Sequence, residues 1–151
     1  LPEPIVISYV NFPLMLVLYF LGAIPEEFAW TSTLTAPMTE KYGHVMGGTW
    51  LGLIWGIWHI IPWSWAHPLW WIGGMMLLNI LFRIFMVFVY EFGGKSLFPS
   101  LLFHMMINVC TGLFPNDGSH FNPWIFCFVF IVIVGLQIGY FSKVYNKNTY
   151  Y

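Results

Sequence analysis

Long runs of apolar residues, unbroken by charge, constrain this chain more than any other feature. A helix needs about 17–25 such residues to cross a bilayer, and five stretches of the 151-residue sequence are long and apolar enough. They run over residues 5–24, 45–61, 69–90, 97–113 and 124–141. The runs are continuous rather than alternating, which favours helices over soluble strands and over the strands of an outer-membrane barrel. The sequence therefore predicts an all-α, polytopic transmembrane bundle of about five spanning helices.

Charged side chains are too few for a soluble protein of this size. Hydrophobic residues make up 59% of the chain and charged residues 7%, against about 25% charged residues in soluble domains. Such a chain cannot cover a surface exposed to water, so its expected partner is the lipid bilayer. The formal net charge of −1 provides no basic surface for nucleic acid. We expect a single membrane domain over residues 1–151, with a polar, frayed tail at 143–151.

Prolines and short polar stretches mark the predicted ends of the spans. Pro25 and Pro62 follow the first two apolar runs, and proline disrupts hydrogen bonding inside a helix. A threonine-rich, more polar stretch at 26–43 is predicted to link these spans, and short turns rich in turn-forming residues join the later ones. The chain begins at Leu1 with no basic segment, so we expect no signal peptide and further residues upstream.

The lysines indicate how the bundle is oriented in its membrane. Lys41 lies in the stretch after the first span, Lys95 in the turn after the third, and Lys143 and Lys147 in the tail. Alternate connections fall on the same side of a bilayer, so all four lysines are predicted to share one side. Cytoplasmic segments are enriched in Lys and Arg, which predicts a cytoplasmic C-terminus for a protein of the cell membrane.

Few polar side chains lie within or directly beside the apolar runs. An ionisable group at membrane depth costs several kcal/mol unless it faces a partner or a cavity. Each such residue is therefore a candidate for function. They are Glu26, Glu27, His59, Asn79, Arg83, His104, Asn108 and Gln137.

Each candidate also has a purely structural interpretation. Glu26 and Glu27 could begin a helix, where acidic side chains favour the positive end of the helix dipole. His59, near the end of a span, is typical of an interfacial residue, and Asn108 could form an interhelical hydrogen bond. His104 and Asn108 are four residues apart and share one face of an apolar helix, and this pair is harder to explain by structure alone.

Two histidines and a carboxylate on three helices are suited to two catalytic designs. In one, Glu26, His59 and His104 hold a metal ion, with zinc as the first candidate, and leave a position open for water. In the other, a glutamate activates water with the help of a histidine, while His104 and Asn108 stabilise an oxyanion. The sequence contains neither HExxH nor GxSxG, which excludes the zincin and nucleophile-elbow arrangements.

Three short motifs follow one another along these helices. They are Glu26-Glu27, then Trp55-xxx-His59, then His104-xxx-Asn108. Their order and setting resemble the signature of the CPBP family, the CAAX-protease and bacteriocin-processing (Abi) intramembrane proteases: EExxxR, an aromatic residue followed four positions later by His, and HxxxN. The resemblance covers about residues 14–112. It departs at the arginine of EExxxR, where this chain has Thr31, whose hydroxyl cannot pair bidentately with a carboxylate.

The resemblance implies an intramembrane endopeptidase with its active site in a cavity among the helices. It implies Glu26 as the base that activates water together with His59, Glu27 as its support, and His104 with Asn108 as oxyanion donors. The participation of zinc stays open. So does the substrate, because the family acts both on prenylated CAAX proteins and on bacteriocin-type leader peptides.

Two other classes of protein compete with the protease. A non-catalytic scaffold or regulatory partner on the same fold is favoured by Thr31 in place of the motif arginine. A small transporter would use Arg83 and the histidines as a charge pathway. We predict instead that Arg83 pairs with a carboxylate, Glu27 first and Glu91 second, although an arginine near a helix end can also snorkel to the interface.

The predicted boundaries place the candidate residues at different depths. Glu26 lies near the cytoplasmic end of the first span, whereas His59 lies late in the second. The two meet only if the helix carrying Glu26 is sunk in the bilayer or if the second span is displaced. Irregular backbone at depth is tolerated around a water-filled cavity, so we retain a shared site and expect the boundaries to move.

Overall fold

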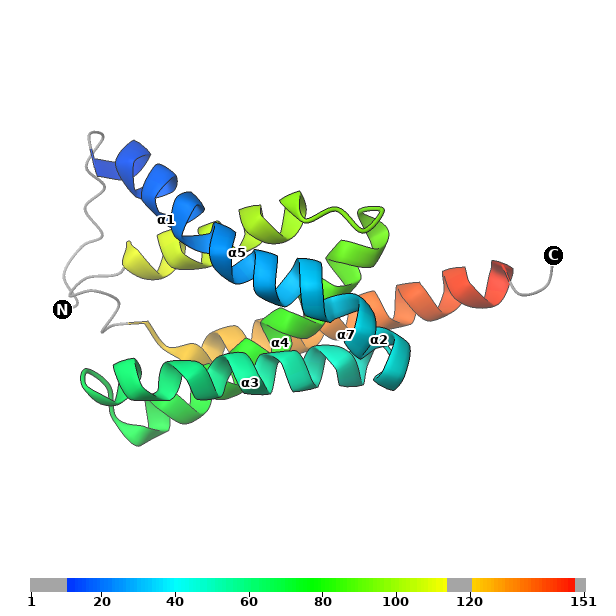
Figure 1. Ribbon diagram of the computed structural model, residues 1–151. Coiled ribbons are helices and arrows are strands. Elements are labelled where there is room, and N and C mark those ends of the chain that lie inside the picture. The colour runs from blue at the N-terminus through cyan, green and yellow to red at the C-terminus, as the bar shows by residue number, and fades with distance from the viewer. Residues whose placement is uncertain (1–10, 114–120, 149–151) are drawn as a thin grey trace.

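Helices account for every element of the described chain. The computed structural model describes residues 11–113 and 121–148. In chain order, the elements are α1 (Asn11–Glu27), the π-helix η1 (Phe28–Leu34), α2 (Thr35–Tyr42), α3 (His44–Ser64), α4 (Leu69–Phe92), α5 (Phe98–Gly112) and α7 (Pro123–Asn148). The predicted all-α bundle is confirmed (Figure 1).

Four stretches of helix are long and apolar enough to cross a bilayer. They are Phe12–Tyr42, His44–Ser64, Leu69–Phe92 and Pro123–Val144. The exception is α5, because its 15 residues rise only about 22 Å, against a hydrocarbon core of about 30 Å. The fourth predicted span is therefore present as a helix, but it is too short to cross an unthinned bilayer by itself.

The first span differs most from its prediction. Pro25 does not end it, because Phe12–Tyr42 is one continuous stretch of 31 helical residues, and most of the predicted linker at 26–43 is helical. A π-helical segment follows the proline, and within it Thr33 donates to the carbonyl oxygen five residues earlier, as does Thr35 at its end, at 3.0 and 3.1 Å. Local π adjustments and hydroxyl bonds of this kind satisfy carbonyl oxygens where the hydrogen-bond pattern of a membrane helix changes.

This continuity changes the depth of Glu26. The residue lies near the middle of the long first stretch of helix rather than at its cytoplasmic end. Pro62 likewise lies inside α3, which continues to Ser64, and α7 continues through the predicted frayed tail as far as Asn148. The conflict in depth is thus resolved by corrected boundaries and not by a displaced second span.

The helices form two groups that meet at one end of the molecule. In one group α1 packs along α5, and in the other α4 packs against both α3 and α7 (Figure 1). The groups are joined where α2 packs against α3 and η1 approaches α4. Toward the other end the two groups diverge (Figure 1).

Three glycines on one face of α3 set its distance from α4. Gly48, Gly52 and Gly56 are spaced by four residues and are buried. A Cβ atom at Gly48 would lie 2.7 Å from the Cα of Ile84, and one at Gly52 would lie 2.7 Å from the carbonyl oxygen of Asn79. Small residues at this spacing let two helices approach closely in a membrane. The contact holds α3 and its neighbouring side chains firmly against α4.

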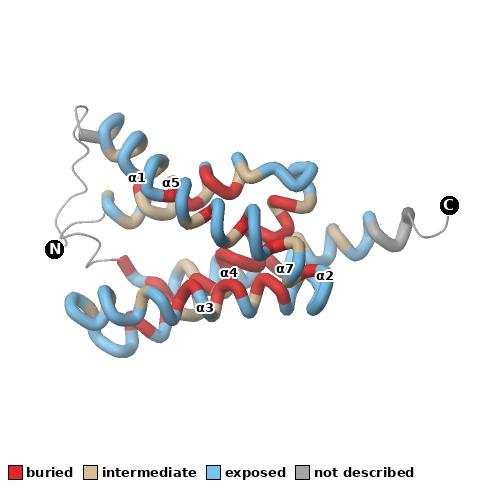
Figure 2. Tube along the Cα trace, in the orientation of Figure 1, coloured by how far each residue is buried: buried red, intermediate tan, exposed pale blue. Residues whose placement is uncertain are grey.

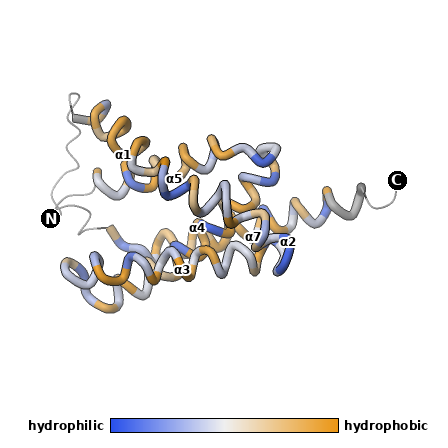
Figure 3. The backbone as a smooth tube through the Cα atoms, viewed as in Figure 1, coloured by the Kyte–Doolittle hydropathy of each residue, from blue (hydrophilic) through white to orange (hydrophobic). Residues whose placement is uncertain are grey.

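Burial identifies α4 as the central helix. In its most apolar segment 67% of the residues are buried, against 11% in the corresponding segments of the first and last spans. Figure 2 shows buried positions concentrated where α3 and α4 face each other. The outer helices α1 and α7 expose large apolar side chains such as Leu18, Phe128 and Leu136. Figure 3 shows the same helices as predominantly hydrophobic. Such outward apolar faces are the surfaces that lipid covers.

The segments that carry the lysines gather at one end of the bundle. The end of α2, the turn between α4 and α5, and the C-terminal part of α7 lie together, whereas the turn between α3 and α4 lies at the opposite end (Figure 1). Lys41, Lys95 and Lys143 belong to the first three of these segments. Their predicted placement on one side of a membrane is compatible with this arrangement.

Candidate active site

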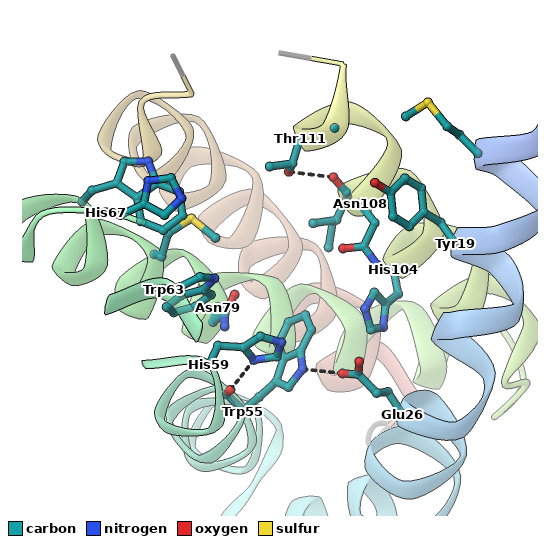
Figure 4. Close-up of a pocket in the computed structure, with 15 residues that line it drawn as sticks. Tyr19, Glu26, Trp55, His59, Trp63, His67, Asn79, His104, Asn108 and Thr111 are labelled. Carbon is teal, nitrogen blue, oxygen red and sulfur yellow. Dashed lines mark hydrogen bonds between the residues drawn. The ribbon is translucent and has the colours of Figure 1, made fainter. Parts of the chain in front are cut away.

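A cavity of about 670 Å³ lies between the α1–α5 pair and the α3–α4 pair (Figure 4). Carboxylate, imidazole and amide groups share its walls with aromatic and sulfur-containing side chains. The lining residues are Met15, Tyr19, Glu26, Trp55, His59, Trp63, His67, Trp71, Met75, Asn79, His104, Ile107, Asn108, Thr111 and Gly112. Polar side chains thus gather at this cavity, whereas the outer faces of the bundle and much of its core are apolar.

The structure brings together five residues of the three motifs singled out from the sequence. They are Glu26 from α1, Trp55 and His59 from α3, and His104 and Asn108 from α5. All three motifs thus reach one cavity. Glu27 does not line it and is fully buried behind it, so the two glutamates of the first motif are separated.

Trp55 connects the first motif with the second. Its indole Nε1–H donates to Oε2 of Glu26 at 2.8 Å, which leaves the other carboxylate oxygen for a water molecule in the cavity. The same indole meets the rings of His59 and His104 edge-on, with centroids 5.5 and 5.2 Å away. The aromatic residue four positions before the histidine therefore orients Glu26 and packs against both imidazoles.

Hydrogen bonding determines which nitrogen of His59 carries the proton in the neutral ring. Nδ1 lies 2.8 Å from the backbone carbonyl oxygen of Trp55, and a carbonyl only accepts, so Nδ1 is the donor. Nε2 then has the lone pair that can take up a proton. The ring stacks on Trp63, with centroids 5.1 Å apart, and this contact restricts its orientation.

Glu27 occupies a very different environment from Glu26. Arg83 donates to both of its oxygens at 2.9 and 2.8 Å, and Thr31 donates to Oε2 at 2.5 Å. Nδ1 of His104 lies 2.8 Å from Oε1. The permanently charged guanidinium keeps this carboxylate as an anion, and its oxygens are occupied by these bonds. Glu27 is therefore a fixed charge and not a group that activates water.

Arg83 supplies the guanidinium that Thr31 cannot. It reaches both oxygens of Glu27 from α4 and is only 2% exposed, so the predicted pairing of Arg83 with Glu27 is confirmed and snorkelling to the interface is excluded. Glu91, the second predicted partner, instead lies 3.9 Å from Nε2 of His44. The carboxylate of Glu27 is thus held by an arginine that is distant in sequence, and Thr31 adds a neutral hydrogen bond.

Glu27 also determines the chemistry of His104. Because an ionised carboxylate only accepts, Nδ1 of His104 donates to it, and Nε2 is the atom left for the cavity. In the neutral ring Nε2 is an acceptor, so it donates to an oxyanion only after it has gained a proton. The resulting imidazolium would face the negative charge of Glu27. Asn108, one turn further along α5, lines the same cavity with an amide that can always donate.

The donors predicted for a metal ion do not gather around one point. Within residues 11–113 and 121–148, no three His, Cys, Asp or Glu side chains lie together in a way that could hold an ion. Glu26, His59 and His104 share the cavity, but the indole of Trp55 packs against both imidazoles. We therefore derive no step through zinc from this arrangement.

Several cavity residues carried no predicted role. Trp63 lies four residues after His59 on α3, and Trp71, Met75 and Asn79 are spaced by four on α4. Positions four apart share a helix face, so this spacing is the sequence signal that could have found them. Asn79 was recognised as a polar residue within a span, but nothing in its spacing assigned it a task.

The turn between α3 and α4 contributes His67 to the cavity. Its ring stacks on Trp71, with centroids 3.6 Å apart. Partial burial lowers the pKa of His67 below its ordinary value of 6.5, because removing water disfavours the charged imidazolium. This histidine is therefore stabilised in its neutral, stacked form.

A carboxylate, two imidazoles and an amide inside an apolar helical bundle are the groups that an intramembrane hydrolase uses. The sequence profile of the family described as type II CAAX prenyl endopeptidase Rce1-like matches residues 8–110, and the chain belongs to that family. The resemblance to the CAAX proteases is thereby confirmed. No curated protein and no solved structure matches the chain significantly. At the level of the family, the protein is a multi-pass membrane protease whose partners are the lipid bilayer and a peptide substrate.

Proposed function

We propose that this protein is an intramembrane endopeptidase of the CAAX-protease and bacteriocin-processing type, in which Glu26 activates the water that cleaves a peptide bond. The observation that carries the proposal is the setting of Glu26: Trp55 binds one of its oxygens, and it shares a cavity with His59, His104 and Asn108. The cavity volume of about 670 Å³ is within the usual range for ligand sites, about 300–1,000 Å³. It has room for a short extended segment of peptide.

The first step is attack by water on the scissile carbonyl. A water molecule bound at the second oxygen of Glu26 gives a proton to this carboxylate as its own oxygen bonds to the carbonyl carbon. Nε2 of His59 is a second acceptor in the same cavity and can share that proton. General base catalysis of this kind contributes about 10²–10⁴-fold to the rate.

The tetrahedral intermediate needs donors for its oxyanion. Asn108 supplies an N–H from its carboxamide. His104 supplies one from Nε2 in molecules in which that atom has taken up a proton from cavity water before the attack, with Glu27 stabilising the imidazolium. The C–N bond then breaks as the leaving amine takes a proton from Glu26 or His59. The carboxylate is regenerated for the next turnover.

Glu27 has a positioning role in this scheme, because it acts through His104 rather than on the substrate. The same pair of residues bears on the alternative, a non-catalytic scaffold, whose main support is Thr31 in place of the motif arginine. Arg83 holds the carboxylate that the missing arginine would hold. The substitution at position 31 is therefore a weaker argument against catalysis than it is in the sequence alone.

The proposal extends to the substrate, to a candidate metal ion and to the membrane in which the protein lies. We propose a prenylated CAAX protein or a bacteriocin-type leader peptide as substrate, and zinc is the metal to test. The protein is proposed to lie in the cell membrane with its C-terminus in the cytoplasm, because the lysine-bearing segments share one end of the bundle.

The test is peptide cleavage by the purified protein in lipid nanodiscs. The panel contains prenylated CAAX peptides and leader peptides, with products identified by mass spectrometry in the presence and absence of a zinc chelator. Wild type should cleave at least one member of the panel. Cleavage that survives the chelator supports water activation by Glu26 alone, whereas cleavage lost with the chelator and restored by zinc would add a metal to the mechanism.

Glu40→Ala is the matched control, because it removes a glutamate from the exposed surface of α2. Glu26→Ala should abolish cleavage while the protein still folds, and Glu40→Ala should leave cleavage unchanged. A Glu26→Ala variant as active as wild type would contradict the mechanism. Failure of both wild type and Thr31→Arg across the panel would favour the non-catalytic scaffold.

A further inference from the structure

One carboxamide in the cavity wall has no part in the reaction described above. Asn79 lies in the middle of α4, is 3% exposed and lines the cavity (Figure 4). It comes from α4, whereas the other amide of the cavity, Asn108, comes from α5. Two helices thus each contribute an amide to the same space, and only one of these amides has a role.

The side chain of Asn79 is not fully satisfied. Its Nδ2 is buried and has no hydrogen-bond partner within the part of the chain that the structure describes. A buried donor without an acceptor is destabilising, and buried polar groups in native proteins are nearly always paired. Asn79 lines the cavity although this nitrogen is buried, so a ligand in the cavity can supply the missing acceptor once the carboxamide turns.

Among the described residues, Nδ2 of this carboxamide forms no hydrogen bond to a neighbouring helix. The common structural task of an asparagine within a span is a hydrogen bond to a neighbouring helix. At this level α3 approaches α4 through Gly52, which faces the backbone carbonyl of Asn79 rather than its side chain. Gln137 on α7 also has a buried atom, Oε1, that lacks a partner among the described residues, but it does not line the cavity. A comparison of variants at Asn79 and Gln137 therefore distinguishes the effect of losing a buried carboxamide from the effect of losing one that lines the cavity.

A peptide main chain is the ligand that suits this amide. Each peptide group carries one donor and one acceptor, and a carboxamide presents the same two groups side by side. We propose that Asn79 binds the main chain of the substrate, with Nδ2–H donating to a backbone carbonyl close to the scissile bond. The proposal rests on the endopeptidase function above and adds a substrate-binding residue on α4 to it.

The proposed bond requires only a local movement. The terminal torsion of asparagine has a broad, roughly two-fold profile, so a half-turn exchanges the oxygen and the nitrogen and lets either atom face the cavity. One turn along the same helix, Nε of Arg83 is also buried without an acceptor among the described residues. Positions four apart are neighbours on a helix face, so these two donors come from the same face of α4.

The variant Asn79→Leu tests the inference, with Gln137→Leu as the matched control. Both remove a carboxamide that has a buried unpaired atom, but only the first removes it from the cavity. Asn79→Leu should raise KM for a cleavable peptide about three- to tenfold, with a smaller change in kcat and with Tm unchanged or raised. Gln137→Leu should change neither KM nor kcat. An unchanged KM for Asn79→Leu, or an equal rise in both variants, overturns the inference.

A backbone ester in the substrate locates the contact. Replacing one peptide bond by an ester weakens its carbonyl as an acceptor, and the ester is moved along the peptide one bond at a time. With the ester at one position, wild type should bind the peptide more weakly, whereas Asn79→Leu should bind it as well as the unmodified peptide. Such non-additive losses indicate a direct contact between the two groups. Additive losses at every position overturn the direct bond. If Asn79→Leu does not fold, Asn79→Ala replaces it, and if neither folds the residue is structural and the inference fails.

Peptide binding without turnover keeps this inference separable from the proposed function. In a Glu26→Gln background, binding of a fluorescent peptide is measured by anisotropy, and adding Asn79→Leu should weaken it about three- to tenfold. A wild type that binds peptides but cleaves none contradicts the endopeptidase and leaves the binding result to decide on Asn79. Cleavage by wild type together with unchanged binding in the Asn79→Leu background contradicts the role of Asn79 alone.

Discussion

Glu26 and Glu27 are neighbours in sequence, yet they lie in opposite environments. Glu26 borders the cavity with one oxygen bound to an indole, whereas Glu27 is fully buried and bonded to Arg83, Thr31 and His104. Adjacent helical residues point about 100° apart, so one helix directs one carboxylate to the cavity and the other into the packing. A single motif thus provides one group that can exchange protons and one whose charge is fixed.

The largest expected effect comes from substituting each glutamate separately. Glu26→Gln should lower kcat about 10²–10⁴-fold and leave Tm close to that of wild type, because only one neutral donor depends on it. Glu27→Gln should lower Tm as well, because removing one partner of a buried ion pair costs about 3–5 kcal/mol. Turnover and thermal unfolding in nanodiscs measure both effects. Equal losses of Tm in the two variants would remove the distinction between the two carboxylates.

The next effect concerns the source of the positive charge beside Glu27. Arg83→Met should destabilise the protein by about 3–5 kcal/mol, because it leaves a buried carboxylate without its counter-charge. Adding Thr31→Arg, four residues from Glu27, should restore part of this stability. Thermal unfolding of the single and double variants measures the recovery.

A double-mutant cycle provides the control for that pairing. The losses of stability in Arg83→Gln and Glu27→Gln should be strongly non-additive, because each variant already removes the same interaction. If the two losses add, or if Thr31→Arg worsens the Arg83→Met variant, the two residues do not act as a pair.

A smaller effect is expected on the cavity side of the comparison. Trp55→Phe keeps an aromatic ring but removes the N–H that binds Glu26, and a hydrogen bond to a charged group is worth about 1.5–3 kcal/mol. We expect kcat to fall about tenfold. Trp63→Phe is the control, since Trp63 stacks on His59 and does not bond to Glu26 in the described structure. Equal activities of the two variants would show that the indole does not orient the base.

The smallest effect involves His67, whose pKa is lowered by partial burial. Its folded pKa lies below the ordinary value of 6.5, so the unfolded chain binds a proton first as the pH falls. The stability that the neutral ring contributes is therefore present above about pH 6.5 and is lost as the pH falls through the folded pKa. His67→Phe keeps a ring over Trp71 without titrating. Between neutral and mildly acidic pH, wild type should lose slightly more Tm than this variant, and an equal loss would contradict the prediction.

The later helices were easier to predict from the sequence than the first one. The spans at 69–90 and 124–141 lie within α4 and α7, because a long, continuous apolar run strongly favours a helix. In the first span, Pro25 and several threonines are typical of a loop in water. In lipid the same hydroxyl groups satisfy carbonyl oxygens and let the helix continue.

The chemistry of the site was predictable from the sequence, whereas its geometry was not. Polar residues are costly within spans, so Glu26, His59, His104 and Asn108 stood out, and a buried Arg83 had to have a counter-charge. Which glutamate faces the cavity depends on the rotation of α1 about its axis. The exposure of any residue of α4 to the cavity depends on its register with α3 and α5, and these are properties of the packed helices rather than of one segment.

The glycines of α3 give the bundle a mechanical property. Because a Cβ atom at Gly48 or Gly52 would collide with the backbone of α4, a methyl group at either position would push the two helices apart. His59 lies two turns beyond Gly52 on the same helix, so a shift of α3 away from α4 would also move the imidazole of His59. The lack of side chains at these glycines thus determines the position of the His59 imidazole. Substituting them would change the geometry of the cavity without altering a residue that lines it.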